Sequence, residues 1–224
     1  MTERKTALKL RNLFSAKDMT VGAPWQRIAE FAVPMLLGNI AQQLYNTVDS
    51  IVVGQFVSKQ ALAAVGSTTS IINMLVGFFS GVSVGAGVII SQRFGAKDPE
   101  GVHKAVHTTI SLTLIIGLIG TVVGIVLAPI MLTLMKTPQD VFVEAKAYLQ
   151  IYFGGISGLM LYNMGSGILR AVGDSRRPLY FLVFSSCVNI VLDLLFVLGF
   201  HMGVEGVAYA TIIAQFSSAA LIYF

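Results

Sequence analysis

The sequence predicts an all-α, polytopic membrane protein with six transmembrane helices. Of its 224 residues, 55% are hydrophobic and only 12% are charged, a balance that soluble domains of this size do not show. Residues 31–58 and 178–204 are long and apolar but contain one acid each, Asp49 and Asp193. A helix needs about 20 residues to cross a hydrocarbon core of ~30 Å. Four further stretches of at least this length contain no Lys, Arg, Asp or Glu: residues 60–92, 105–135, 147–169 and 206–224.

Two other architectures fit less well. A transmembrane β-barrel predicts apolar residues at every second position, whereas here they run continuously. Buried core helices of a large soluble protein are the alternative, but such helices seldom exceed about 14 unbroken apolar residues. We therefore expect a cytoplasmic basic tail over residues 1–24 and a six-helix transmembrane lobe over residues 25–224. The expected helices cover about 31–57, 61–92, 104–131, 141–171, 178–199 and 204–224.

Local signals support the first two helices. Trp25 precedes the first helix at the depth of the membrane interface, and Pro34 lies early enough in this helix to be tolerated. The second helix contains Gly81, Gly85 and Gly87, which favour close contact with a neighbouring helix.

The loops after the second and fourth helices share one order of residue types, with a basic residue, a glycine, an acid and a proline. In the first loop Gly95 is a stop signal, and Asp98 followed by proline is a start signal for the third helix. Residues 170–178 repeat this order, which is a weak sign of an internal repeat that turn chemistry alone can also produce. His103 and His107 have the i,i+4 spacing of a metal pair, but the nearby acids do not complete a ligand set, so we expect no metal there.

Basic residues are concentrated on one predicted side of the membrane. All Lys and Arg except Lys59, Lys136 and Lys146 fall in the tail, the second loop or the fourth loop. By the positive-inside rule we expect a multi-pass protein of the inner (cytoplasmic) cell membrane, with both termini of this chain cytoplasmic. This asymmetry accounts for the net charge of +4, so we expect no nucleic-acid partner. Cys187 is the only cysteine, which excludes an intrachain disulfide.

Asp49 and Asp193 are candidate functional residues, because holding an ionised carboxylate in hydrocarbon costs roughly 3 kcal/mol or more. Each lies 15 residues past a proline near the cytoplasmic side, Pro34 or Pro178, which puts both about 23 Å along their helices. Thr211 lies about 9 Å inside the outer end of the last helix. In a core of ~30 Å, all three residues can share one layer.

Polar neighbours extend this layer on the faces that carry the acids. In the fifth helix, Asn189 lies one turn before Asp193. The first helix carries a stripe with i, i+3, i+4, i+7 spacing, made of Gln42, Tyr45, Asn46 and Asp49. Such stripes are unstable against lipid, so we expect both faces to point into the bundle or a wet cavity. A hydrogen-bonded polar clamp between helices is the alternative, although a clamp needs no acids.

The chemistry of this layer suits a cation. Two close carboxylates in a low dielectric do not both ionise easily, so one is protonated or the pair shares a cation. Oxygen atoms suited to a proton network or to Na⁺ come from Asp49, Asp193, Asn189 and Thr211, and the sequence does not choose between the two ions. Beyond this coupling ion we expect no cofactor. We expect no enzyme, since the sequence has no Walker A pattern, no nucleophile and base pair and no metal-ligand spacing.

Four segments carry a family resemblance. The pattern P-x₄-N-x₅-YN-x₂-D-x₄-G begins at Pro34, and it is followed by "SQRFGAKD" at Ser91, "AVGDSRRP" at Ala171 and "NIVLDLLFVLG" at Asn189. Together they resemble the multidrug and toxic compound extrusion (MATE) transporters, particularly the branch related to the DNA-damage-inducible F proteins. The resemblance covers nearly the whole chain, and the two acids, the asparagine and the glycine loops occur in family order.

The resemblance implies a fold and a function. It implies one lobe of a twelve-helix antiporter that consists of two six-helix lobes and expels organic cations in exchange for H⁺ or Na⁺. Asp49, Asp193 and Asn189 match the cation-coupling site of the N-terminal lobe, and Thr211 matches its member in the sixth helix. Contacts to drugs are implied in the cleft between the lobes, where the weaker candidates are Gln42, Tyr45, Asn46 and Asn163.

The chain has about half the length of the family. We expect either a partial reading frame that lacks the C-terminal lobe, or two copies that pair as half-transporters. The expected partners are the lipid bilayer, small organic cationic substrates, and the C-terminal lobe or a second copy. Two alternatives to a cation-coupled multidrug antiporter stay open at this point. One is a lipid-linked oligosaccharide or lipid flippase of the same superfamily, and the other is a non-transporting membrane subunit or truncated fragment.

Overall fold

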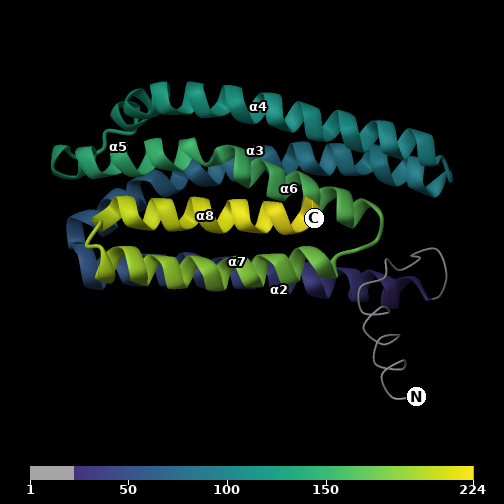
Figure 1. Cartoon of the computed structure of the whole chain (residues 1–224), viewed down its shortest axis with the longest axis horizontal. Coiled ribbons are helices and arrows are strands. Elements are labelled where there is room, and N and C mark those ends of the chain that lie inside the picture. Colours follow the sequence, from purple (N-terminus) through teal and green to yellow (C-terminus); the bar gives the residue numbers. More distant parts are fainter. Residues whose placement is uncertain (1–22, 224) are drawn as a thin grey trace, which may run out of the picture.

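A computed structural model describes residues 23–223, and every regular element in this part of the chain is a helix (Figure 1). The predicted all-α fold is therefore confirmed. The predicted tail, residues 1–24, lies outside the described residues except for Ala23 and Pro24. In chain order, with η for a π-helix, the elements are α2 (Pro24–Val52), η1 (Val53–Val57), α3 (Lys59–Gly95), α4 (Pro99–Leu134), α5 (Gln139–Gly154), α6 (Ile156–Ala171), α7 (Arg176–Leu194), η2 (Leu195–Gly199) and α8 (Gly203–Tyr223).

Two helices, α2 and α7, continue into short π-helical segments at the same end of the bundle (Figure 1). Ser58 directly follows η1. Its backbone is extended, and its hydroxyl accepts a hydrogen bond from the Ala61 amide at 2.9 Å. Ser58 thereby caps the start of α3. Both π segments follow directly on the helices that contain the two membrane acids. π-helical turns of this kind occur frequently at functional sites.

The expectation of one continuous helix over residues 141–171 is wrong, because the chain breaks at Gly155 into α5 and α6. The Gly155 amide donates to the carbonyls of Ile151 and Tyr152, which closes the last turn of α5. A Cβ atom at Gly155 would lie 2.3 Å from Cγ1 of Ile212 in α8. The break therefore falls where α8 packs directly against the backbone.

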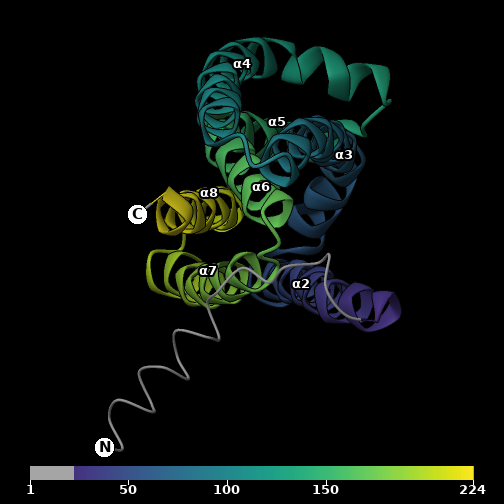
Figure 2. The same cartoon turned by 90° about the vertical axis from the view of Figure 1, so that its right-hand side faces the viewer.

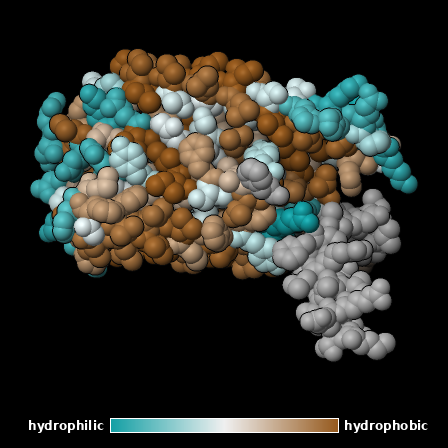
Figure 3. Space-filling view, in the orientation of Figure 1, coloured by the Kyte–Doolittle hydropathy of each residue, from teal (hydrophilic) through white to brown (hydrophobic). Residues whose placement is uncertain are grey.

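Four of the described helices are long and apolar enough to cross a membrane, namely α3, α4, α7 with η2, and α8. α5 and α6 are too short singly, because the break at Gly155 leaves 16 residues in each. α2 is long, but its asparagine and glutamine residues make it less apolar. The first and fourth of the six predicted spans thus stay predictions. On the face shown in Figure 3, hydrophobic residues form a broad belt between hydrophilic ends.

α6 lies in the middle of the bundle and packs against α3, α4 and α8, while α7 packs against α2 and α8 (Figure 2). Two buried apolar clusters hold these helices together. One joins the four helices α3, α4, α5 and α6 and includes Leu132, Leu149 and Ile156. The other joins η1 to α3, α5 and α8 and includes Val53 and Val207. This packing places α2 and α7, which carry the acids, side by side.

The small residues of α3 make only one of the expected close contacts. A Cβ atom at Gly87 would lie 3.6 Å from the carbonyl oxygen of Gly167 in α6, so the two helices approach closely there. A Cβ atom at Gly81 or Gly85 would meet no described atom within 4 Å. The expectation of close helix contact is therefore wrong for these two glycines within the described part of the chain.

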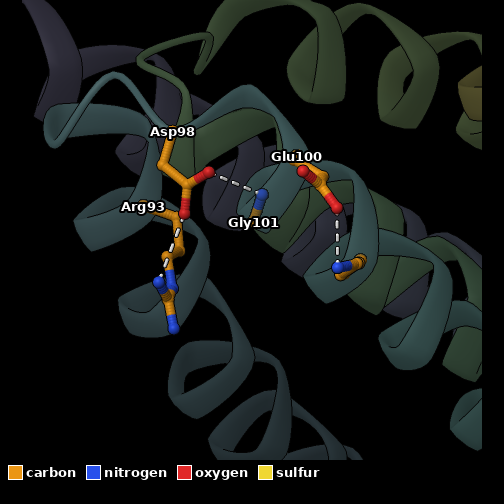
Figure 4. A network of polar contacts seen from close by, with 5 residues as sticks. Arg93, Asp98, Glu100 and Gly101 are labelled. Atoms are coloured by element: carbon orange, nitrogen blue, oxygen red, sulfur yellow. Dashed lines mark hydrogen bonds and ion pairs between the residues drawn. The ribbon is translucent and has the colours of Figure 1, made fainter.

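The turn between α3 and α4 is fixed by Asp98 (Figure 4). Its carboxylate accepts a hydrogen bond from the Gly101 amide at 2.9 Å and pairs with Nη1 of Arg93 at 3.2 Å. Asp98 thus caps α4 and ties it to the end of α3. Lys104 and Glu100 form an exposed pair at 2.7 Å in the first turns of α4.

The two loops with similar sequences turn in the same way. In the loop before α4, the left-handed residue is Lys97, with φ 56°, and Gly95 ends α3. In the loop before α7, the left-handed residue is Gly173, with φ 88°. In both loops the left-handed residue directly precedes the acid, and the acid's amide donates to a carbonyl five residues back, that of Arg93 for Asp98 and of Leu169 for Asp174. The shared order of residue types therefore goes with one shared turn.

Candidate functional site

The four predicted cation-site residues are all buried where α2, α7 and α8 meet. Their exposed fractions are 7% for Asp49, 0% for Asp193, 1% for Asn189 and 6% for Thr211. Asp49 lies in the last turn of α2, Asn189 and Asp193 lie in the last turns of α7, and Thr211 lies in α8. Because α7 packs against both other helices, side chains from three helices converge on one buried region.

The carboxyl groups of Asp49 and Asp193 are in side-chain contact across the α2–α7 interface, within hydrogen-bonding reach of each other. Ionised carboxylates are acceptors only, so this contact is favourable only when a proton or a cation lies between the two groups. The arrangement can therefore hold a proton on one carboxyl or a cation shared by both.

Buried polar atoms that have no hydrogen-bond partner among the described residues are concentrated at this contact. They include both carboxylate oxygens of Asp193, Oδ1 of Asp49, and both Oδ1 and Nδ2 of Asn189. Buried polar atoms are nearly always paired, because an unpaired one costs about 1–3 kcal/mol. The hydroxyl of Thr211 donates to the Val207 carbonyl at 3.0 Å, which leaves its oxygen free to accept. Hard cations take oxygen ligands of this kind.

A small cavity of about 20 Å³ adjoins two of these four residues. Asn189 and Thr211 line it, together with the polar side chains of Gln42, Tyr45, Tyr162, Ser185, Ser186, Gln215 and Ser218. This volume holds about one water molecule or one bare ion. It is far below the roughly 300–1,000 Å³ of sites for drug-sized molecules. The cavity inside the lobe thus fits a small ion and not a drug.

Two tyrosines of α5 belong to this region although the sequence analysis did not single them out. Tyr148 and Tyr152 are 5% and 6% exposed, and their rings stack with centroids 6.4 Å apart. Tyr148 is close enough to interact electrostatically with both Asp49 and Asp193. In the sequence, the i,i+4 spacing of Tyr148 and Tyr152 was the feature that could have pointed to this pair. Buried phenols need polar partners, and the Tyr152 hydroxyl accepts a hydrogen bond from Nε2 of Gln215 at 3.5 Å.

The weaker substrate candidates do not form one group. Gln42 and Tyr45 line the small cavity, so they lie beside the cation site. Asn46 is exposed, and its Nδ2 donates to Oε1 of Gln43 at 3.4 Å. The expectation that Asn46 belongs to a buried stripe is therefore not met. Asn163 holds α6 to α3, because its carbonyl accepts the Ser83 hydroxyl at 2.8 Å.

His103 and His107 lie in contact on the exposed face of α4, with their Nε2 atoms 2.9 Å apart. Among the described residues, no group of three or more His, Cys, Asp or Glu side chains could hold a metal ion.

Known proteins are similar to this chain in sequence and in fold. Residues 34–195 match the family model described as MatE. The chain is 34% identical over 200 residues to "Probable multidrug resistance protein YpnP" of Bacillus subtilis (strain 168), with 89% of this chain and 45% of that protein covered. It is 30% identical over 190 residues to "DNA damage-inducible protein F" of Escherichia coli (strain K12), with 84% and 41% covered.

A solved structure shares the arrangement of the helices. A MOP superfamily transporter from Pyrococcus furiosus superposes with a TM-score of 0.84 at 31% sequence identity, over 90% of this chain and 44% of that one. The chain thus spans less than half the length of the relatives that it matches.

Proposed function

This chain belongs to the MatE family, and on that premise we propose that it is the N-terminal half of a cation-coupled multidrug efflux antiporter. In this proposal Asp49 and Asp193 take up H⁺ or Na⁺ at the α2–α7 contact, with Asn189 and Thr211 as further oxygen ligands. The observation that carries the proposal is the cluster of buried oxygen atoms without partners at this contact. A polar clamp alone has no reason to leave so many acceptors unpaired.

Coupling follows from the change of charge. When the site is empty, two like charges lie in contact across the α2–α7 interface and repel each other. When a proton or Na⁺ is bound, the repulsion is relieved and the two helices pack more closely at this level. Since α2 continues into η1 just beyond Asp49, a change in packing there can be absorbed by the π-helical turn. Alternating access then links the ion to the opening of the cleft.

We propose that the drug binds outside the small cavity, in a cleft completed by a second six-helix lobe or a second copy of this chain. The small cavity has room for one ion or water only, so a drug needs a larger space. Gln42, Tyr45, Asn46 and Asn163 are kept as candidates for contacts to a small organic cation. The protein would lie in the inner membrane with both ends of this chain on the cytoplasmic side.

Dye efflux from proteoliposomes tests this proposal. The chain, reconstituted together with the second lobe or as a pair of copies and given an imposed proton or Na⁺ gradient, should export a cationic dye. Asp49→Asn and Asp193→Asn should each lower the gradient-driven rate by roughly tenfold or more, a loss of at least about 1.4 kcal/mol of coupling. Glu205→Gln is the matched control, because it makes the same chemical change at an exposed acid outside the site.

The same assay distinguishes the alternatives. Efflux that is unchanged in both Asp variants would contradict a coupling role for the carboxyl pair. Movement of a labelled lipid in place of the dye would favour a flippase. Correct insertion of both halves without any efflux would favour a non-transporting subunit.

A further inference from the structure

A second cavity, of about 110 Å³, lies between α2, α3, α6 and α7. Arg170, Ser175 and Pro178 line it where α6 ends and α7 begins, and Gln42 and Val76 line it farther along α2 and α3. Its volume holds several water-sized groups but no drug-sized molecule. The polar side chains that line it are Asn39, Gln42, Ser80, Tyr162, Asn163 and Arg170, with Ser175 at the start of α7.

Arg170 is the charged group of this cavity. Its Nε atom is fully buried and has no hydrogen-bond partner among the described residues. A guanidinium stays charged at all relevant pH values and offers only donors, so a buried Nε–H without an acceptor is unfavourable. Because Arg170 lines the cavity, an acceptor placed there can reach it.

No acid of the described lining neutralises this charge. The other lining residues are apolar or uncharged. Asp174, the buried acid of the adjoining loop, already has partners. Its Oδ1 accepts hydrogen bonds from the amides of Arg176 and Arg177, and its Oδ2 pairs with Nε of Arg177 at 3.1 Å. Asp174 thus stabilises the start of α7 and is not a partner of Arg170. The cavity is left with one positive charge and several amide and hydroxyl groups.

We infer that this cavity binds a phosphate group, with Arg170 as the forked donor and the neighbouring amide and hydroxyl groups as further contacts. An arginine fork matches phosphate oxygens in pairs, and its partial burial strengthens the interaction. Basic pockets between transmembrane helices on the cytoplasmic side suit the phosphate of an anionic lipid. A soluble phosphate ester offers the same chemistry. An anionic ligand at this end of the bundle goes beyond the proposed export of cations, and its binding does not depend on transport.

Binding to the purified full chain in detergent tests the inference with three ligands. Phosphatidylglycerol carries the phosphate on acyl chains, diacylglycerol with the same chains lacks the phosphate, and glycerol 3-phosphate lacks the chains. Native mass spectrometry counts bound lipid, and a thermal-shift titration gives the affinity. We expect phosphatidylglycerol to bind and diacylglycerol not to. Glycerol 3-phosphate that binds and competes identifies a soluble ester as the ligand, whereas binding of the lipid alone identifies a headgroup.

Variants connect the binding to Arg170. Arg170→Gln should weaken phosphatidylglycerol binding roughly tenfold, as expected for the loss of one charge-assisted hydrogen-bonding group. Arg176→Gln removes the same charge from the same end of the bundle without changing the cavity lining, and it should bind like the parent. Ser80→Phe fills the cavity without altering charge and should also weaken binding, which keeps the inference testable where Arg170→Gln does not fold. Equal binding of diacylglycerol, or parent-like binding by Arg170→Gln or by Ser80→Phe, would overturn it.

Discussion

Asp49 in α2 and Asp193 in α7 are far apart in the sequence, yet their carboxyl groups are in contact in the buried interface between the two helices. Each acid lies in the last turn of its helix, and each helix continues into a π-helical segment beyond it. A pair of acids in contact can exist in a low dielectric only with a proton or a cation, so this contact ties the packing of α2 on α7 to the occupancy of the site.

Protons and Na⁺ should compete for this site, because they would occupy the same carboxylate oxygens. Lowering the pH should therefore weaken Na⁺ binding to the purified chain, and raising Na⁺ should displace protons in equal measure. Isothermal titration with Na⁺ at several pH values and constant ionic strength measures this. Asp193→Asn should lose most of the binding, while Glu205→Gln should retain it. Na⁺ affinity that does not change with pH would contradict a shared site.

Asn189 and Ser185 lie about one turn apart in α7, and their replacement should change stability in opposite directions. The amide atoms of Asn189 are buried without partners, so Asn189→Leu should raise the stability by about 1 kcal/mol while it removes a ligand of the ion. The buried Ser185 hydroxyl donates to the Ala214 carbonyl at 2.7 Å, so Ser185→Ala should lower stability by about 1 kcal/mol.

Thermal unfolding in detergent, with and without Na⁺, measures both changes. The stabilisation by Na⁺ that we expect for the parent should disappear in Asn189→Leu and persist in Ser185→Ala. A strongly destabilised Asn189→Leu chain that still responds to Na⁺ would show that Asn189 is a packing residue instead.

The shared level of the acids was predicted from a rise of 1.5 Å per residue after Pro34 and Pro178, although α2 begins earlier, at Pro24. Which helices are neighbours depends on tertiary packing, so the contact itself was not fixed by that count. Asn46 shows the limit of the stripe argument. It lies about 60° around the helix from Asp49, at the edge of the stripe, and it is exposed.

Two other features escaped prediction for physical reasons. The break at Gly155 depends on the approach of Ile212 from α8, which is a contact between distant parts of the chain. Tyr148 and Tyr152 have the spacing of ordinary core aromatics in a membrane helix. Only their position beside the acids distinguishes them, and that position follows from how α5 packs against α8.

Asp98 should contribute to stability chiefly as a helix cap. Asp98→Ala removes the acceptor of the Gly101 amide and should cost about 1 kcal/mol. Its pair with Arg93 is more exposed and adds little. Glu100→Ala is the matched control, because it breaks only the exposed pair with Lys104 and should leave the thermal midpoint nearly unchanged. Equal losses in the two variants would contradict the capping role.

Two glycines in long helices should respond oppositely to alanine, because one is packed against a ring and the other is not. At Gly124 in α4, a Cβ atom would lie 2.0 Å from Cδ1 of Phe153, whose ring is buried in the cluster that joins α3 to α6. The ring has little room to move, so Gly124→Ala should force α4 away from α5 and cost about 1–3 kcal/mol.

At Gly77 in α3, a Cβ atom would meet no described atom within 4 Å. Gly77→Ala should therefore raise stability by about 0.5–1 kcal/mol, because alanine loses less conformational freedom in a helix. Thermal unfolding of the two variants in the same detergent tests the pair. A stabilised Gly124→Ala chain would show that α4 is not held against Phe153. A destabilised Gly77→Ala chain would show that this face of α3 is covered in the protein, for example by a second copy, and it would be accompanied by a lower oligomeric mass.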